Sequence, residues 1–132
     1  RDMFREQIQA LHEAGIDLLT LETFSNLSEI REAILAAREV VGPEMVIIAQ
    51  VTINDDGSLG DGTATEIFTE RLNELPADVI GLNCSSGPRA MLEALERMAG
   101  HTTKPLSAMP NAGLPTTIEG RNIYLCSPEY MA

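Results

Sequence analysis

One cysteine stands where an apolar segment gives way to small residues that form turns. Cys84 follows the mostly apolar run 79–83 and precedes Ser85-Ser86-Gly87-Pro88. In α/β proteins, a strand that ends in such a loop fixes a side chain at the carboxyl edge of the sheet and leaves it open to a ligand. A thiol there can be a nucleophile or a metal ligand, and a single cysteine near a core is often also an inert apolar residue. Position alone leaves these interpretations open.

Polar side chains also end the other apolar segments of the chain. Because parallel strands share one direction, their carboxyl ends meet at one edge of a sheet, and these side chains are expected to gather there. A carboxylate, a thiol and several amides at such a rim are typical of a barrel active site. The candidates are Glu22, Thr52 or Asn54, Asn83 with Cys84, and Asn111.

The elements that position these residues are predicted by hydrophobic periodicity. Apolar strand-like segments at 17–22, 45–53, 79–82 and 106–109 alternate with amphipathic helices, at about 30-residue spacing. Asn26 with Glu29 and Thr63 with Glu66 predict capped helix starts. This alternation predicts βαβ units and a parallel sheet. Four such units cannot close an eight-stranded barrel but make half of one, and no Gly-rich nucleotide-binding motif favours a doubly wound sheet.

Other titratable residues are weaker candidates. Asp55 and Asp56 precede a glycine and are typical of a solvated turn rather than of a metal pair. His12 falls on a helix and His101 just beyond one, so neither is expected to be a catalytic base. Cys126 precedes a helix cap and is interpreted as structural.

The composition excludes several classes of partner. The net charge of −11 argues against nucleic acid and anionic membrane surfaces, and no apolar run approaches the roughly 20 residues of a membrane span. Two cysteines and no export signal predict a cytoplasmic protein. Both ends look cut, because Arg1 falls inside a helix and Ser127-Pro128 announces another helix. Residues 1–132 are therefore expected to be a fragment of one barrel domain.

The predicted rim contains no histidine or lysine, and this limits the ways in which the Cys84 thiol could be activated. A cysteine nucleophile needs a base or a cation to hold it as a thiolate, and none adjoins Cys84. A metal would do the same, since a coordinated thiol is deprotonated. One cysteine cannot hold zinc alone, so further ligands would have to come from outside this segment.

Three motifs in order resemble the homocysteine S-methyltransferase family. They are Gly15-Ile16-Asp17-Leu18-Leu19 running into Glu22-Thr23-Phe24, then Ile80-Gly81-Leu82-Asn83-Cys84-Ser85 with Gly87-Pro88, then Pro110-Asn111-Ala112-Gly113-Leu114-Pro115. The resemblance spans essentially the whole chain. It implies a partial (β/α)8 TIM barrel containing strands 4–7.

The resemblance also implies roles for single residues. Cys84 matches the first of three cysteines that bind zinc, and the other two are expected beyond Ala132. Glu22 matches the acidic residue that holds the substrate amino group, and Asn83 and Asn111 match positions lining the same pocket. The implied reaction is transfer of a methyl group to the zinc-activated thiol of homocysteine, giving methionine. The methyl donor, such as methylcobalamin or a methylated folate, and any donor-binding module stay open.

Two rival functions remain at this point. One is a barrel enzyme that uses Cys84 as a covalent nucleophile on a carbonyl or thioester, without zinc. The other is an inactive half-barrel that associates with itself or with the missing half through its exposed strand edges.

Overall fold

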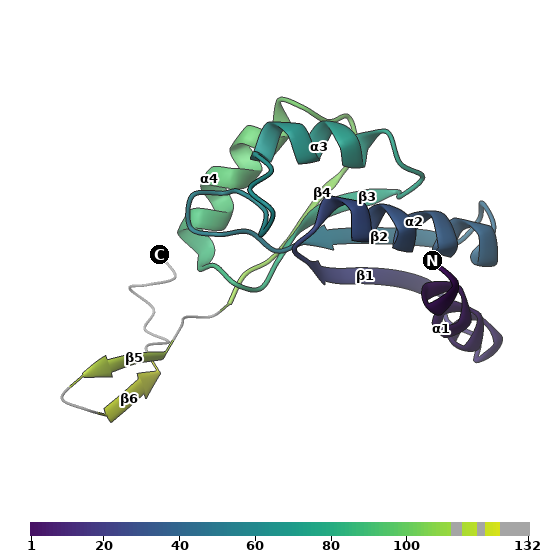
Figure 1. The fold of residues 1–132 in the computed structure, drawn as a ribbon, viewed down its shortest axis with the longest axis horizontal. Coiled ribbons are helices and arrows are strands. Elements are labelled where there is room, and N and C mark those ends of the chain that lie inside the picture. The colour runs from purple at the N-terminus through teal and green to yellow at the C-terminus, as the bar shows by residue number, and fades with distance from the viewer. Residues whose placement is uncertain (112–114, 119–120, 125–132) are drawn as a thin grey trace.

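The computed structural model describes residues 1–111, 115–118 and 121–124, arranged as layers of helix and parallel sheet (Figure 1). None of the helices among these residues is long and apolar enough to cross a membrane. In chain order the elements are α1 (Asp2–Glu13), β1 (Leu18–Phe24), α2 (Leu27–Val41), β2 (Val46–Val51), α3 (Thr65–Asn73), β3 (Val79–Asn83), α4 (Pro88–Ala99), β4 (Leu106–Met109), β5 (Pro115–Ile118) and β6 (Arg121–Tyr124).

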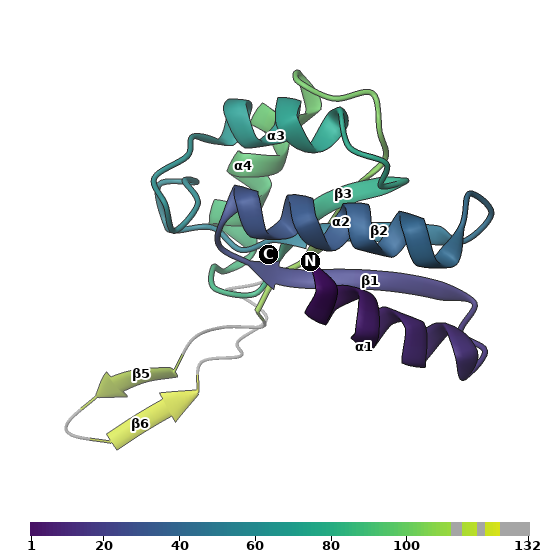
Figure 2. The ribbon, with the colours of Figure 1, turned by 45° about the vertical axis from the view of Figure 1, so that its right-hand side comes forward.

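The main sheet has four parallel strands in the order β1-β2-β3-β4. Each strand leads through a helix to its next neighbour, and right-handed crossovers of this kind place α2, α3 and α4 on the same face of the sheet. Helix α1 packs against α2, beside β1 (Figure 2). Consecutive parallel strands with helices on one face form a partial (β/α)8 barrel, which confirms the predicted fold class.

The two faces of the sheet differ in burial. Every second strand residue points toward the helices, and these side chains make the core with the apolar stripes of α2, α3 and α4. On the other face, Leu18, Val46 and Met109 are each about half exposed. The main strand residues of the core are Leu19, Leu21, Ile47, Ala49, Val51, Ile80 and Leu82.

One predicted helix cap is confirmed and the other is wrong. The Asn26 side chain accepts hydrogen bonds from the backbone N–H groups of Ser28 and Glu29, at 2.9 and 3.2 Å. Helix α3 instead begins at Thr65 after Ala64, and Thr63 caps nothing. The Asp61 carboxylate binds both the N–H and the hydroxyl of Thr63, so a local side-chain turn displaces the expected cap.

An antiparallel hairpin follows the fourth parallel strand and was not predicted. Strands β5 and β6 pair with each other and form a separate two-stranded sheet. Cys126 and the helix predicted from Ser127 onward lie outside the described residues.

Arg38 joins three segments at the amino ends of the strands. Its guanidinium donates to the carbonyl oxygens of Gly42, Met45 and Pro76 at 2.7–3.0 Å, and to the Asp78 carboxylate at 2.7 Å. Burial by itself would raise the pKa of Asp78. The hydrogen bond from the backbone N–H of Ile47, together with the hydrogen bond and positive charge of Arg38, outweighs this effect, so the pKa of Asp78 lies below its ordinary value. The pair therefore stabilises the fold above the ordinary carboxyl pKa of about 3.9, and that contribution is lost as pH falls through the lowered value.

Arg38→Lys is expected to lower the free energy of unfolding by about 2 kcal/mol, measured by urea denaturation of the full-length protein. Lysine keeps the charge but lacks the planar fork that serves several acceptors at once. Arg31→Lys is the matched control, because the Arg31 side chain on the same helix is 56% exposed and pairs with its neighbour Glu32. An equal effect of the two substitutions would contradict the role assigned to Arg38.

Candidate functional site

The carboxyl end of β1 carries a β-bulge. Two residues of β1, Glu22 and Thr23, lie opposite a single residue of β2, Gln50, because the pairing shifts between Leu21 and Phe24. Thr23 adopts a left-handed conformation with φ of 67°, which is rare for a β-branched residue. Bulges occur often beside active sites, where they redirect a side chain. Here the bulge carries the exposed carboxylate of Glu22.

A side-chain clamp joins the bulge to β3. Asn83, 5% exposed at the end of β3, accepts a hydrogen bond from the backbone N–H of Thr23 at 2.9 Å and donates to its hydroxyl at 2.7 Å. The oxygen and the nitrogen of the Asn83 amide thus both bind β1, although β1 and β3 are not adjacent strands in the sheet. The clamp links the ends of β1 and β3. Glu22 itself lines a hollow of about 280 Å³ between β1 and α1, together with Phe4 and Ile8.

The loop after β3 presents the thiol of Cys84. Cys84 and Ser85 both have left-handed backbones, with φ of 56° and 58°, and Cys84 is exposed. The N–H of Cys84 donates to the carbonyl of Met109 at 3.0 Å, and the N–H of Asn111 donates to that of Ser86 at 3.3 Å. The backbone therefore ties the thiol loop to the end of β4 and brings Asn111, which is partly buried, to the same rim.

One polar row crosses the sheet just below this rim. Gln50, Gly81 and Ser107 are register partners on β2, β3 and β4. The Gln50 amide reaches across Gly81 and donates to the Ser107 hydroxyl at 3.0 Å. A Cβ atom at position 81 would lie 2.1 Å from the Ser107 carbonyl oxygen, so only glycine fits between the two strands. Gln50 was not predicted as a site residue, although a polar amide within an apolar strand could have indicated one.

The loops after β2 and β3 border a shallow, open hollow of about 550 Å³. Asp55 and Asp56 are exposed beside Gly57, whose φ is 83°, which confirms the predicted solvated turn. Hydrogen bonds from the hydroxyl and the N–H of Ser58 lower the pKa of Asp56, so its carboxylate is already engaged locally. The hollow is lined by Ile53, Asn54, Asp55, Asp56 and Ser85, and so adjoins the thiol loop.

Whether a metal could bind at Cys84 depends on the donor atoms that the neighbouring residues supply. The thiol is exposed at the rim and fits the role of one thiolate ligand. Within the described part of the chain, no three His, Cys, Asp or Glu side chains lie close enough together to bind one ion. His101 pairs with Glu70 at 2.9 Å, and His12 is exposed on α1. Cys84 is the one cysteine among the described residues, so this part of the chain could supply a single thiolate to a metal.

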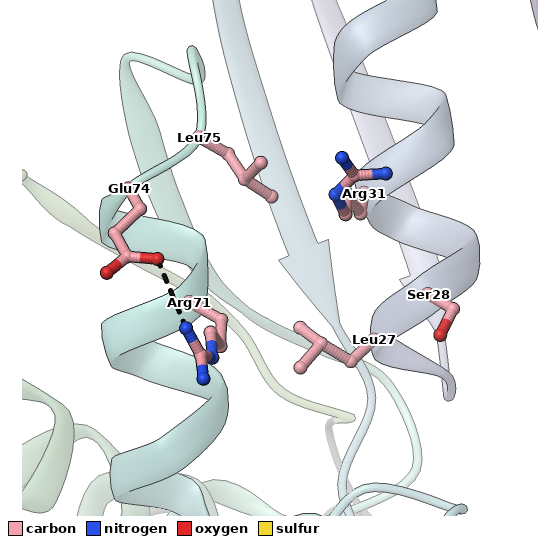
Figure 3. Close-up of a pocket in the computed structure, with 6 residues that line it drawn as sticks. All are labelled: Leu27, Ser28, Arg31, Arg71, Glu74 and Leu75. Carbon is pink, nitrogen blue, oxygen red and sulfur yellow. Dashed lines mark ion pairs between the residues drawn. The ribbon is translucent and has the colours of Figure 1, made fainter.

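A second cavity lies away from the rim. A groove of about 340 Å³ lies between α2 and α3, and in it Arg71 pairs with Glu74 at 3.5 Å. Figure 3 shows the side chains of Leu27 and Leu75 pointing into the space between the two helices. Its lining comes entirely from helices and the turn after α3. This groove therefore belongs to the outer helical layer and not to the strand-end site.

Comparisons with known sequences agree on one family. A family model described as homocysteine S-methyltransferase matches residues 1–132. A methionine synthase of Mycobacterium tuberculosis (strain ATCC 25618 / H37Rv) is 33% identical over 118 residues, covering 87% of this chain. A methionine synthase of Mycobacterium leprae (strain TN) is 30% identical over 135 residues, covering the whole chain.

A solved structure shares the fold. The apo form of the homocysteine methyltransferase MmuM from Escherichia coli superposes with a TM-score of 0.66 at 30% identity, over 83% of this chain and 44% of that one. The chain spans about a tenth of the length of the two mycobacterial relatives.

Proposed function

Because the chain belongs to the homocysteine S-methyltransferase family, we propose that it forms the part of a methyltransferase barrel that binds homocysteine and presents its thiol to a methyl donor. The observation that carries the proposal is the exposed Cys84 thiol, in a loop that backbone hydrogen bonds tie to Met109 and Asn111 at the carboxyl end of the sheet. Asn83, just before it, binds the bulge that carries Glu22. The names of the mycobacterial relatives support methionine as the product.

Cys84 is proposed to hold zinc as one of several thiolate ligands. When bound, zinc would supply the Lewis acidity that keeps the substrate thiol, whose pKa is ordinarily near 8.5, deprotonated at neutral pH. The hydrogen bond from the Cys84 N–H to Met109 and the left-handed turn at Cys84 and Ser85 fix the thiol at the rim. This chain therefore contributes one ligand in a set position.

Glu22 is proposed to pair with the ammonium group of homocysteine. The carboxylate is exposed on the bulge, and a charge-assisted hydrogen bond to it fixes both the position and the orientation of the substrate. With the ammonium held at β1 and the sulfur at the end of β3, the thiolate is directed toward the donor. A sulfur–carbon bond then forms as the bond between the donor and its methyl group breaks.

Asn83 and Asn111 act on the shape of the site in this proposal. Both polar ends of the Asn83 amide bind Thr23, so Asn83 is proposed to fix the end of β1 relative to the end of β3. Asn111 is held beside Ser86 through its backbone N–H, and its side chain is proposed to line the pocket.

The proposal is tested with the full-length protein, zinc and homocysteine. Methylcobalamin, methyltetrahydrofolate, S-methylmethionine and betaine are supplied in turn, and methionine is quantified. Methionine is expected with at least one donor and in proportion to bound zinc. Failure with all four donors, at full zinc occupancy, would overturn the function.

Glu22→Ala is expected to raise the KM for homocysteine about 10- to 100-fold while zinc content stays unchanged. A lost charge-assisted hydrogen bond of about 1.5–3 kcal/mol corresponds to that range. Glu44→Ala is the control, because Glu44 is also an exposed carboxylate and lies just before the amino end of β2. An unchanged KM in Glu22→Ala would remove Glu22 from the substrate site.

A further inference from the structure

Three buried side-chain atoms lack a hydrogen-bond partner among the described residues, and all three lie at one end of the sheet. They are Gln50 Oε1, Thr52 Oγ1 and Ser86 Oγ. Gln50 and Thr52 lie two residues apart, on or just beyond β2, and Ser86 belongs to the thiol loop. Buried polar atoms are nearly always paired in folded proteins, so a cluster of unpaired ones at a candidate site points to a ligand that completes it.

Gln50 is the most buried of these groups and the best placed. It is fully inaccessible to solvent, and its Nε2 is already bound to Ser107, which fixes the orientation of the amide. The amide oxygen is left as an acceptor without a donor. Gln50 also lies directly opposite the bulge of Glu22 and Thr23 on the neighbouring strand.

We propose that Gln50 is a second acceptor for the substrate ammonium group, working together with Glu22; this rests on the proposed function above. An ammonium group carries three N–H donors, and a carboxylate with a neighbouring amide oxygen accepts two of them. The Ser107 hydroxyl holds the amide so that its oxygen, rather than its nitrogen, is available. Gln50 is thus a specificity residue that distinguishes amino-acid thiols from thiols without an amino group.

The test compares two variants in the full-length zinc-loaded protein. Gln50→Met preserves the side-chain volume but removes both the amide oxygen and the hydrogen bond to Ser107. Ser107→Ala removes only that hydrogen bond and keeps the Gln50 amide oxygen. Each variant is measured for its KM toward homocysteine and for its Ki toward 4-mercaptobutyrate, which is homocysteine without the amino group.

Gln50→Met is expected to raise the homocysteine KM about 10- to 100-fold, as for the loss of a hydrogen bond to a charged group, and to leave the Ki of 4-mercaptobutyrate within about twofold. Ser107→Ala leaves the acceptor in place but frees the amide to turn, so it is expected to raise the homocysteine KM by less than Gln50→Met does. Gln50→Glu, which restores an oxygen acceptor, is expected to recover the wild-type KM within about threefold. If Gln50→Met does not fold, Gln50→Asn makes the same test by withdrawing the amide by one methylene.

Two results would overturn the inference. An unchanged homocysteine KM in Gln50→Met excludes contact with the substrate. An equal loss of affinity for both thiols, together with a lower Tm, means that Gln50 serves packing and not the amino group. Both results presuppose a wild-type protein that methylates homocysteine. A wild type without that activity counts instead against the proposed function.

Discussion

Cys84→Ala is expected to lose nearly all bound zinc and to lower kcat/KM for homocysteine about a thousandfold or more. The estimate follows from the several kcal/mol that a metal contributes to activating a nucleophile, at 1.36 kcal/mol for each factor of ten. Zinc is measured by elemental analysis of the purified full-length protein, and turnover by methionine formation. The effect is large because the described residues offer no other thiol at the rim.

Cys126→Ala is the matched control for this variant, since it removes the same group from the second cysteine of the chain. It is expected to retain zinc and turnover. Cys84→Ala protein that keeps both zinc and full activity would remove Cys84 from the site. Rapid alkylation of Cys84 in metal-free wild type that is still fully active would instead favour a covalent nucleophile.

Gly81→Ala is expected to abolish the native pairing of β3 and β4, so that little soluble, active protein is recovered. The added Cβ would lie 2.1 Å from the carbonyl oxygen and 2.3 Å from the hydroxyl oxygen of Ser107. The carbonyl is part of the backbone and cannot rotate away, so the strands would have to separate. Overpacking usually costs about 1–3 kcal/mol, and a clash with backbone in a central strand is expected to exceed that range.

Gly81→Ala is also expected to displace the candidate site, because Asn83 and Cys84 follow Gly81 by two and three residues on the same strand and its loop. Gly100→Ala is the control, because Gly100 has an ordinary φ of −78° and its nearest neighbour would lie 3.7 Å from the new Cβ. Its Tm is expected to stay near that of the wild type. Recovery of Gly81→Ala with a wild-type Tm, measured by differential scanning calorimetry, would contradict the crowding described here.

Much of the fold follows from local sequence signals. The four parallel strands and the helices between them follow the hydrophobic periodicity of the chain, and the Asn26 cap lies where its residue type predicts it. Such features depend on neighbours within one turn of helix or one strand. Thr63 failed as a cap because Asp61, only two residues away, competes for the same hydroxyl and N–H.

The candidate site was only partly predictable. Glu22, Asn83, Cys84 and Asn111 were recognised because they end or follow apolar segments. The structure ties the thiol loop to the segment of Asn111, and it places Glu22 on the bulge of β1. The bulge at Thr23 was not, since nothing in a threonine predicts a left-handed backbone. The link from Asn83 to Thr23 and the unpaired oxygen of Gln50 depend on contacts across strands, which one sequence does not reveal.

The left-handed backbones of Cys84 and Ser85 set thermal stability against the loop geometry that is proposed to present the thiol. Each such residue costs of order 1–3 kcal/mol, and glycine at Ser85 would relieve that cost within the folded state. Glycine at Thr23 would also remove the hydroxyl to which Asn83 donates, so no gain is expected there. A selection for heat resistance alone would therefore favour glycine at Ser85. The same exchange would loosen the loop that holds the thiol, so variants chosen by melting temperature should be poor starting points for improving turnover.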